Sequence, residues 1–122
     1  MRRVGSRAIA GLILAASFST AAVAEGQGRY TVAGTNVKDK LDYQGTATLT
    51  KTGNMTWQMI EVIGSDTIEG FGVGDGKIIA MSFDNGGSAT VAIYIANADG
   101  GYTGMWAGED DKEVSTETLK PQ

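Results

Sequence analysis

The chain has 122 residues and a formal net charge of −4, and it contains neither histidine nor cysteine. These absences exclude Ser-His-Asp and Cys-His catalysis, histidine-based metal sites and disulfide bonds. The acidic balance also argues against nucleic-acid binding, because recognition of phosphates needs clustered lysines and arginines.

The first 24 residues have the pattern of a secretory signal peptide. Residues 1–7 carry three arginines and no acid, an apolar run follows at 8–18, and Ala22-Val23-Ala24 is a small-x-small cleavage site. The apolar run is shorter than the about 20 residues that a membrane-spanning helix needs. We therefore expect a signal peptide at 1–24 and a mature, secreted or periplasmic domain at 25–122. That part holds all 14 acidic residues and 7 of the 10 basic residues, so its formal charge is −7.

The remaining sequence predicts short strands joined by tight turns. The clearest hairpin lies at 89–107, where β-branched residues alternate with others at 90–95, and Asn, Asp and glycines at 97–101 reverse the chain. Other strands are predicted at 29–34, 43–51, 55–62, 67–73, 77–83 and 114–119.

About eight strands in one domain predict an all-β antiparallel meander. Closure into a small lipocalin- or avidin-like barrel would remove both exposed sheet edges, and eight strands enclose side chains or one small ligand. Glycines within the predicted strands, at positions 45, 70, 72 and 104, permit the coiling that a closed barrel needs. A two-sheet β-sandwich remains the alternative.

Carboxylates are the remaining candidates for catalysis or metal binding. Glu61 and Glu69 fall on adjacent predicted strands and could oppose each other, as glycoside hydrolysis requires of two acids, but we expect both to be solvated surface residues. The acidic stretch 109–113 lacks the alternating ligand pattern of a Ca²⁺ loop, and we interpret it as a solvated turn. The sequence therefore predicts no catalytic residue, metal or cofactor.

Aromatic side chains are the residues best suited to line a ligand pocket, since such sites combine aromatic walls with a few polar groups. They can equally fill the core. We expect the ring of Trp106 to point into the barrel and to be largely buried, because it shares a strand face with Gly104. The candidate ligand-binding residues are Trp57, Trp106, Tyr43, Tyr94 and Tyr102.

Four segments, RYTVAGTN, YQGTATLT, ATVAIYIANADGGYTGMW and TETLKP, follow one another in this order. They resemble a family of small secreted bacterial proteins, some of which carry the label fibronectin-binding protein. The resemblance runs from Tyr30 to Pro121 and rests mostly on turn and core positions. The chain departs from it at 38–40, where Lys-Asp-Lys replaces the common Pro-Asp-Gly. The resemblance implies a β-rich binding domain and supplies no catalytic residues.

Three functions follow as hypotheses. The first is a non-enzymatic secreted or periplasmic protein that binds a host or envelope protein, with a secreted protein inhibitor as a variant. The second is a small-molecule carrier that uses a barrel mouth around Trp57 and Trp106. An enzyme built on carboxylates is the third. A cavity lined by aromatic residues with inward polar groups favours the carrier, whereas a filled interior and an exposed apolar patch favour a protein partner.

Overall fold

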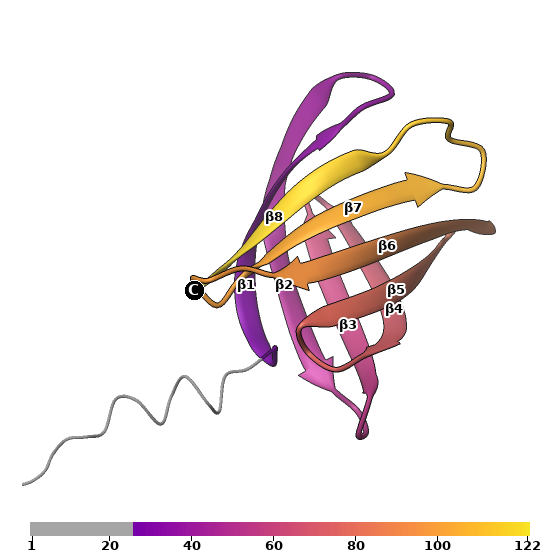
Figure 1. Cartoon of the computed structure of the whole chain (residues 1–122). Coiled ribbons are helices and arrows are strands. Elements are labelled where there is room, and N and C mark those ends of the chain that lie inside the picture. The colour runs from indigo at the N-terminus through magenta and orange to yellow at the C-terminus, as the bar shows by residue number, and fades with distance from the viewer. Residues whose placement is uncertain (1–25) are drawn as a thin grey trace, which may run out of the picture.

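The computed structural model describes residues 26–122, which form a closed eight-stranded barrel (Figure 1). Each strand pairs antiparallel with the next along the chain, and the last strand closes the sheet on the first. The strands are β1 (Gly28–Asn36), β2 (Leu41–Lys51), β3 (Thr56–Ile63), β4 (Asp66–Gly74), β5 (Ile78–Asn85), β6 (Ser88–Ala96), β7 (Tyr102–Gly108) and β8 (Ser115–Pro121). The predicted meander and barrel are confirmed, and the sandwich alternative is excluded. The signal peptide predicted at 1–24 lies outside the described residues.

Closure of the barrel depends on pairing between its first and last strands. In that pair Val32 lies opposite Leu119 and Gly34 lies opposite Glu117. Figure 1 shows β1 and β8 side by side although they stand at the two ends of the described chain. Closure therefore places the N-terminal strand beside the most distant strand in sequence, which no local pattern specifies.

Alternation along each strand decides which side chains face the interior. In β3, Trp57, Met59 and Glu61 are buried, whereas their neighbours Gln58 and Val62 are exposed. The same period of two continues around the barrel and produces one apolar core. Within the described residues, no helix is long and apolar enough to cross a membrane.

One end of the barrel is filled by aromatic side chains whose polar atoms bond to the backbone. The Trp57 indole N–H donates to the Gly74 carbonyl at 2.9 Å, and the Tyr102 hydroxyl donates to the Gly76 carbonyl at 2.6 Å. The Tyr30 hydroxyl likewise donates to a backbone carbonyl, and its ring meets that of Tyr102 edge to face at 5.9 Å. This end, which we call the closed end, is a packed core with satisfied polar groups.

Candidate functional site

The opposite end of the barrel contains a cavity of about 370 Å³. It lies among the strand ends that meet the β1–β2, β3–β4, β5–β6 and β7–β8 loops, so we call this the open end. Its walls combine aromatic and aliphatic side chains with several carboxylates. The lining residues are Asn36, Asp39, Leu41, Asp42, Tyr43, Glu61, Ile63, Asp66, Ile68, Phe83, Thr90, Tyr94, Trp106 and Glu117.

A hydrogen-bonded network crosses the inner part of this cavity and centres on Glu117. The Tyr94 hydroxyl donates to Glu117 Oε2 at 2.6 Å, and the Tyr43 hydroxyl donates to Glu117 Oε1 at 2.7 Å. The Trp106 indole N–H donates in turn to the Tyr43 oxygen at 2.9 Å. Glu61 also hydrogen-bonds Glu117, and its Oε2 lies 3.3 Å from the Tyr94 hydroxyl. Five side chains from five strands therefore form one connected polar group.

The donors and acceptors of this network determine which of the two glutamates is protonated. Glu117 accepts the single hydroxyl protons of Tyr43 and Tyr94, which suits an ionised carboxylate. A hydrogen bond between the two glutamates needs a proton on one of them, and Glu117 already serves as the acceptor. Glu61 is therefore the protonated acid, and the network carries one negative charge.

The electrostatics of the site agree with this assignment. Glu61 is 6% exposed, and burial together with the neighbouring Glu117 raises the pKa of Glu61 to about 9. Burial and the same carboxylate also raise the pKa values of Tyr43 and Tyr94, so both hydroxyls keep their protons at neutral pH. Two carboxylates this close in a buried site cannot both be ionised without a large energetic cost.

Two glycines make room for the tyrosines that bond Glu117. A Cβ built on Gly104 would lie 2.6 Å from the Tyr94 ring, across the β6–β7 pair. A Cβ on Gly34 would likewise collide with the ring and hydroxyl of Tyr43, its partner in the β1–β2 pair. The missing side chains allow both rings to pass close to the neighbouring strand while their hydroxyls reach Glu117.

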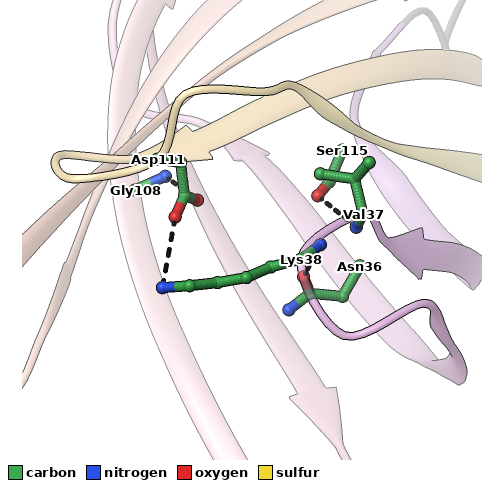
Figure 2. A network of polar contacts seen from close by, with 6 residues as sticks. All are labelled: Asn36, Val37, Lys38, Gly108, Asp111 and Ser115. Atoms are coloured by element: carbon green, nitrogen blue, oxygen red, sulfur yellow. Dashed lines mark hydrogen bonds and ion pairs between the residues drawn. The ribbon is translucent and has the colours of Figure 1, made fainter.

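The β1–β2 and β7–β8 loops are joined to each other beside the cavity (Figure 2). The Val37 backbone N–H donates to the buried Ser115 hydroxyl at 2.9 Å, and Lys38 Nζ lies 3.6 Å from Asp111 Oδ1. Asp111 also accepts the Gly108 N–H at 2.8 Å. Because Asn36 at the end of β1 and Asp39 of the β1–β2 loop line the cavity, these contacts hold one side of its entrance.

The candidate ligand-binding residues separate between the two ends of the barrel. Tyr43, Tyr94 and Trp106 line the cavity, whereas Trp57 and Tyr102 lie in the closed end and do not line it. The two tryptophans therefore do not share one barrel mouth, contrary to the expectation from the sequence. Trp106 packs against the core as expected and is only partly exposed. It lines the cavity and also borders the second hollow described below.

The acidic residues also differ from their expected places. Glu61 lies opposite Ile68 and faces the interior, while Glu69 lies opposite Ile60 and is exposed, so these two acids do not oppose each other. The expectation that Glu61 is a solvated surface residue is wrong. Its partner is Glu117, which sequence reasoning missed although Glu117 alternates in phase with the buried Ser115 and Leu119.

Part of the acidic stretch 109–113 has structural contacts of its own. Asp111 accepts the Gly108 N–H, as described above, and Glu109 Oε1 accepts the Ala89 N–H at 3.0 Å. Asp110 and Glu113 are exposed. No group of three or more acidic side chains within residues 26–122 is placed to hold a metal ion.

A second hollow, of about 520 Å³, lies on the outer surface of the barrel over β4 to β7. It forms because β5 presents the small residues Ala80 and Ser82 between larger apolar neighbours on β4 and β6. We call this surface the outer apolar face. Its large exposed side chains are Phe71, Val73, Val91, Ile93, Met105 and Val114.

Comparisons with known proteins bear on the fold. No family model and no curated protein matches the chain. Among solved structures, the barrel is similar to a Schistosoma mansoni fatty acid binding protein in complex with arachidonic acid, with a TM-score of 0.54 and 10% sequence identity. The match covers 80% of this chain and 96% of that one. The chain therefore shares the closed β-barrel fold of that structure.

Proposed function

We propose that the protein is a non-enzymatic carrier that binds a small, largely apolar molecule in the open-end cavity. The observation that carries this proposal is the cavity itself, about 370 Å³ in a barrel whose other end is fully packed. Its volume and its mixture of aromatic walls with a few polar groups are those of small-molecule sites. The architecture supports the proposal, because the similar solved barrel was determined with a fatty acid.

The carboxylates of the site support binding rather than catalysis. Acid–base cleavage of glycosides needs two carboxyl groups about 5 Å or more apart, with the scissile bond between them. Glu61 and Glu117 are instead hydrogen-bonded to each other, and Glu117 is also held by two tyrosines. These two acids therefore cannot stand on opposite sides of a bound molecule.

Tryptophan fluorescence tests the proposal, because the two tryptophans lie at opposite ends of the barrel. In a Trp57→Phe variant, Trp106 is the single tryptophan and lines the cavity. We expect titration with a neutral apolar probe such as 1-octanol to change its emission saturably. The matched control is Trp106→Phe, whose remaining Trp57 in the closed end should not respond. A Trp106 signal that stays unchanged across a panel of neutral, anionic and cationic amphiphiles would refute the carrier function.

The outer apolar face favours a second candidate function, the binding of a protein partner. Exposed contiguous apolar surface is typical of protein interfaces, and here Phe71 is 72% exposed and Val91 60% exposed. This is the function that the resemblance to fibronectin-binding proteins implies. A Ser82→Arg variant would fill the hollow with a charge and leave the cavity unchanged. Loss of pull-down of an extracellular protein by this variant, with retained octanol binding, would assign binding to the outer face.

For either function we propose that the protein works outside the cytoplasm. The support is the signal-peptide pattern of residues 1–24. Intact mass of the exported protein tests this location. Retention of residues 1–24 in that species would contradict it.

A further inference from the structure

The open-end cavity is lined by acidic side chains, whereas a site for an anionic ligand is usually lined by basic ones. Among residues 26–122, five carboxyl side chains line the cavity, and no lysine or arginine does. The neighbouring base Lys38 is directed to Asp111, and Lys40 is exposed in the same loop. A ligand carboxylate buried in a low-dielectric cavity is stabilised best by a cationic partner, which the described lining residues do not provide.

The hydrogen-bond donors of the inner network are also fewer than its acceptors. Two tyrosine protons and the Glu61 proton are all directed to Glu117, which is 3% exposed. The Trp106 N–H is used by Tyr43. Glu61 therefore receives at most a share of the Tyr94 proton, over the longer distance of 3.3 Å. Its buried carboxyl lines the cavity as an acceptor that lacks a full donor, and a bound molecule with N–H groups would supply one.

We infer that the ligand of this cavity is an apolar amine whose ammonium group binds the Glu61–Glu117 pair. The inference rests on the proposed carrier function and specifies its ligand class. The ammonium brings several N–H donors to an acceptor-rich pair, and its positive charge offsets the negative charge on Glu117. Tyr43, Tyr94 and Trp106 surround the pair with aromatic rings, which also attract organic cations. Asp39, Asp42 and Asp66 at the entrance add a field that attracts a cation.

The test compares three probes with the same alkyl chain and different head groups, namely octylamine, 1-octanol and octanoate. Binding to the Trp57→Phe protein is followed at neutral pH through Trp106. We expect octylamine to bind tightest and octanoate weakest, with about a tenfold or larger difference between the two. An octanoate affinity equal to or higher than that of octylamine overturns the amine inference but leaves the carrier function intact. Failure of all three probes to bind refutes the carrier function itself.

Glutamine variants identify the groups that carry the preference. Glu117→Gln removes the negative charge of the pair and should weaken octylamine binding about tenfold, whereas Glu61→Gln, which resembles the neutral acid, should weaken it less. Binding of 1-octanol should stay unchanged in both variants, which also shows that each variant is folded. The matched control is Glu69→Gln, which removes the same charge from the outer surface of the neighbouring strand and should have no effect. An octylamine preference that survives in both cavity variants would show that the glutamate pair does not bind the ammonium.

Discussion

The Tyr94 hydroxyl lies 2.6 Å from Glu117 Oε2 but 3.3 Å from Glu61 Oε2, and this difference determines the charge of the cavity. A hydroxyl has one proton, and the shorter contact shows that Glu117 receives it. Glu61 then keeps its own proton and donates it to Glu117. A barrel of modest size thus holds one neutral and one ionised acid side by side.

The protonated state of Glu61 predicts that the free energy of unfolding falls as pH rises. Its pKa is about 9 in the folded chain and about 4.5 when unfolded, so between these values the folded state binds one more proton than the unfolded state. The contribution of Glu61 is therefore most favourable below its unfolded pKa and is lost as pH rises through the folded pKa.

Glu61→Gln should remove this loss, because glutamine resembles the protonated acid in shape and donates through its amide. Urea unfolding of the wild type and the variant, measured at several pH values from 5 to 9, checks the prediction. We expect the variant to be the more stable protein at alkaline pH, with the difference shrinking as pH falls. The exposed Glu69→Gln control should follow the wild type. Parallel pH profiles of wild type and Glu61→Gln would show that Glu61 is ionised in the folded protein.

The sequence predicts most of this fold because its signals are local. Alternation and Gly-Asp-Asn turns locate the hairpins, and strand count with mid-strand glycines favours closure, as the structure confirms. The hairpin at 89–107 corresponds to β6 and β7. Strand ends differ from the predicted ones by a few residues, as at β2, which begins at Leu41 rather than 43. Polar residues such as Asp42 extend that strand because backbone pairing with β1 continues beyond the alternating pattern.

The site is less predictable because it depends on contacts across the barrel. Alternation shows that Trp57 and Trp106 face inward, but it does not show which end of the barrel each occupies. The end of the barrel that each tryptophan occupies depends on the direction of β3 and β7 and on the position of the residue along its strand. Glu61 and Glu117 meet only after β8 has paired with β1, and each looks like a surface acid when considered alone. The signal in the sequence that indicates their burial is that each glutamate alternates along its strand in step with buried residues.

Gly104→Ala should disturb the cavity through Tyr94. The added Cβ would lie 2.6 Å from the Tyr94 ring, and the ring cannot retreat without breaking its bond to Glu117. We expect a loss of about 1–3 kcal/mol in the free energy of unfolding, which is typical of overpacking. Denaturant unfolding measures this loss. Met105→Ala, a change to the outward-facing neighbour on the same strand, should cost less than Gly104→Ala. Equal stability of Gly104→Ala and wild type would show that the tyrosine has room to move.

The two contacts between the entrance loops should differ in strength. Ser115 is 2% exposed and accepts the Val37 N–H, so Ser115→Ala leaves a partly buried donor without this acceptor and should cost about 1–3 kcal/mol. Lys38 is 74% exposed in its 3.6 Å contact with Asp111, so Lys38→Ala should cost about 0–1 kcal/mol. Thermal or urea unfolding of both variants, with and without added salt, compares them. A larger loss for Lys38→Ala would mean that the ion pair, rather than the serine, holds the loops together.

Alanine substitution of the two tryptophans should separate a core role from a ligand-contact role. Trp57 is 2% exposed in the closed end and bonds the Gly74 carbonyl, so Trp57→Ala should cost about 3–5 kcal/mol, the usual range for a deleted core aromatic. Trp106 is half-buried beside an existing cavity, so Trp106→Ala removes less packed area and should cost less. It also removes the N–H that bonds Tyr43, which can reorient while still donating to Glu117.

Denaturant unfolding compares the stabilities of the two variants, and the affinity for a fluorescent apolar probe reports whether the cavity still binds a ligand. A Trp106→Ala loss as large as that of Trp57→Ala would show that Trp106 is principally a core residue. Trp57→Ala, where it remains folded, should still bind the probe, because no atom of that side chain lines the cavity.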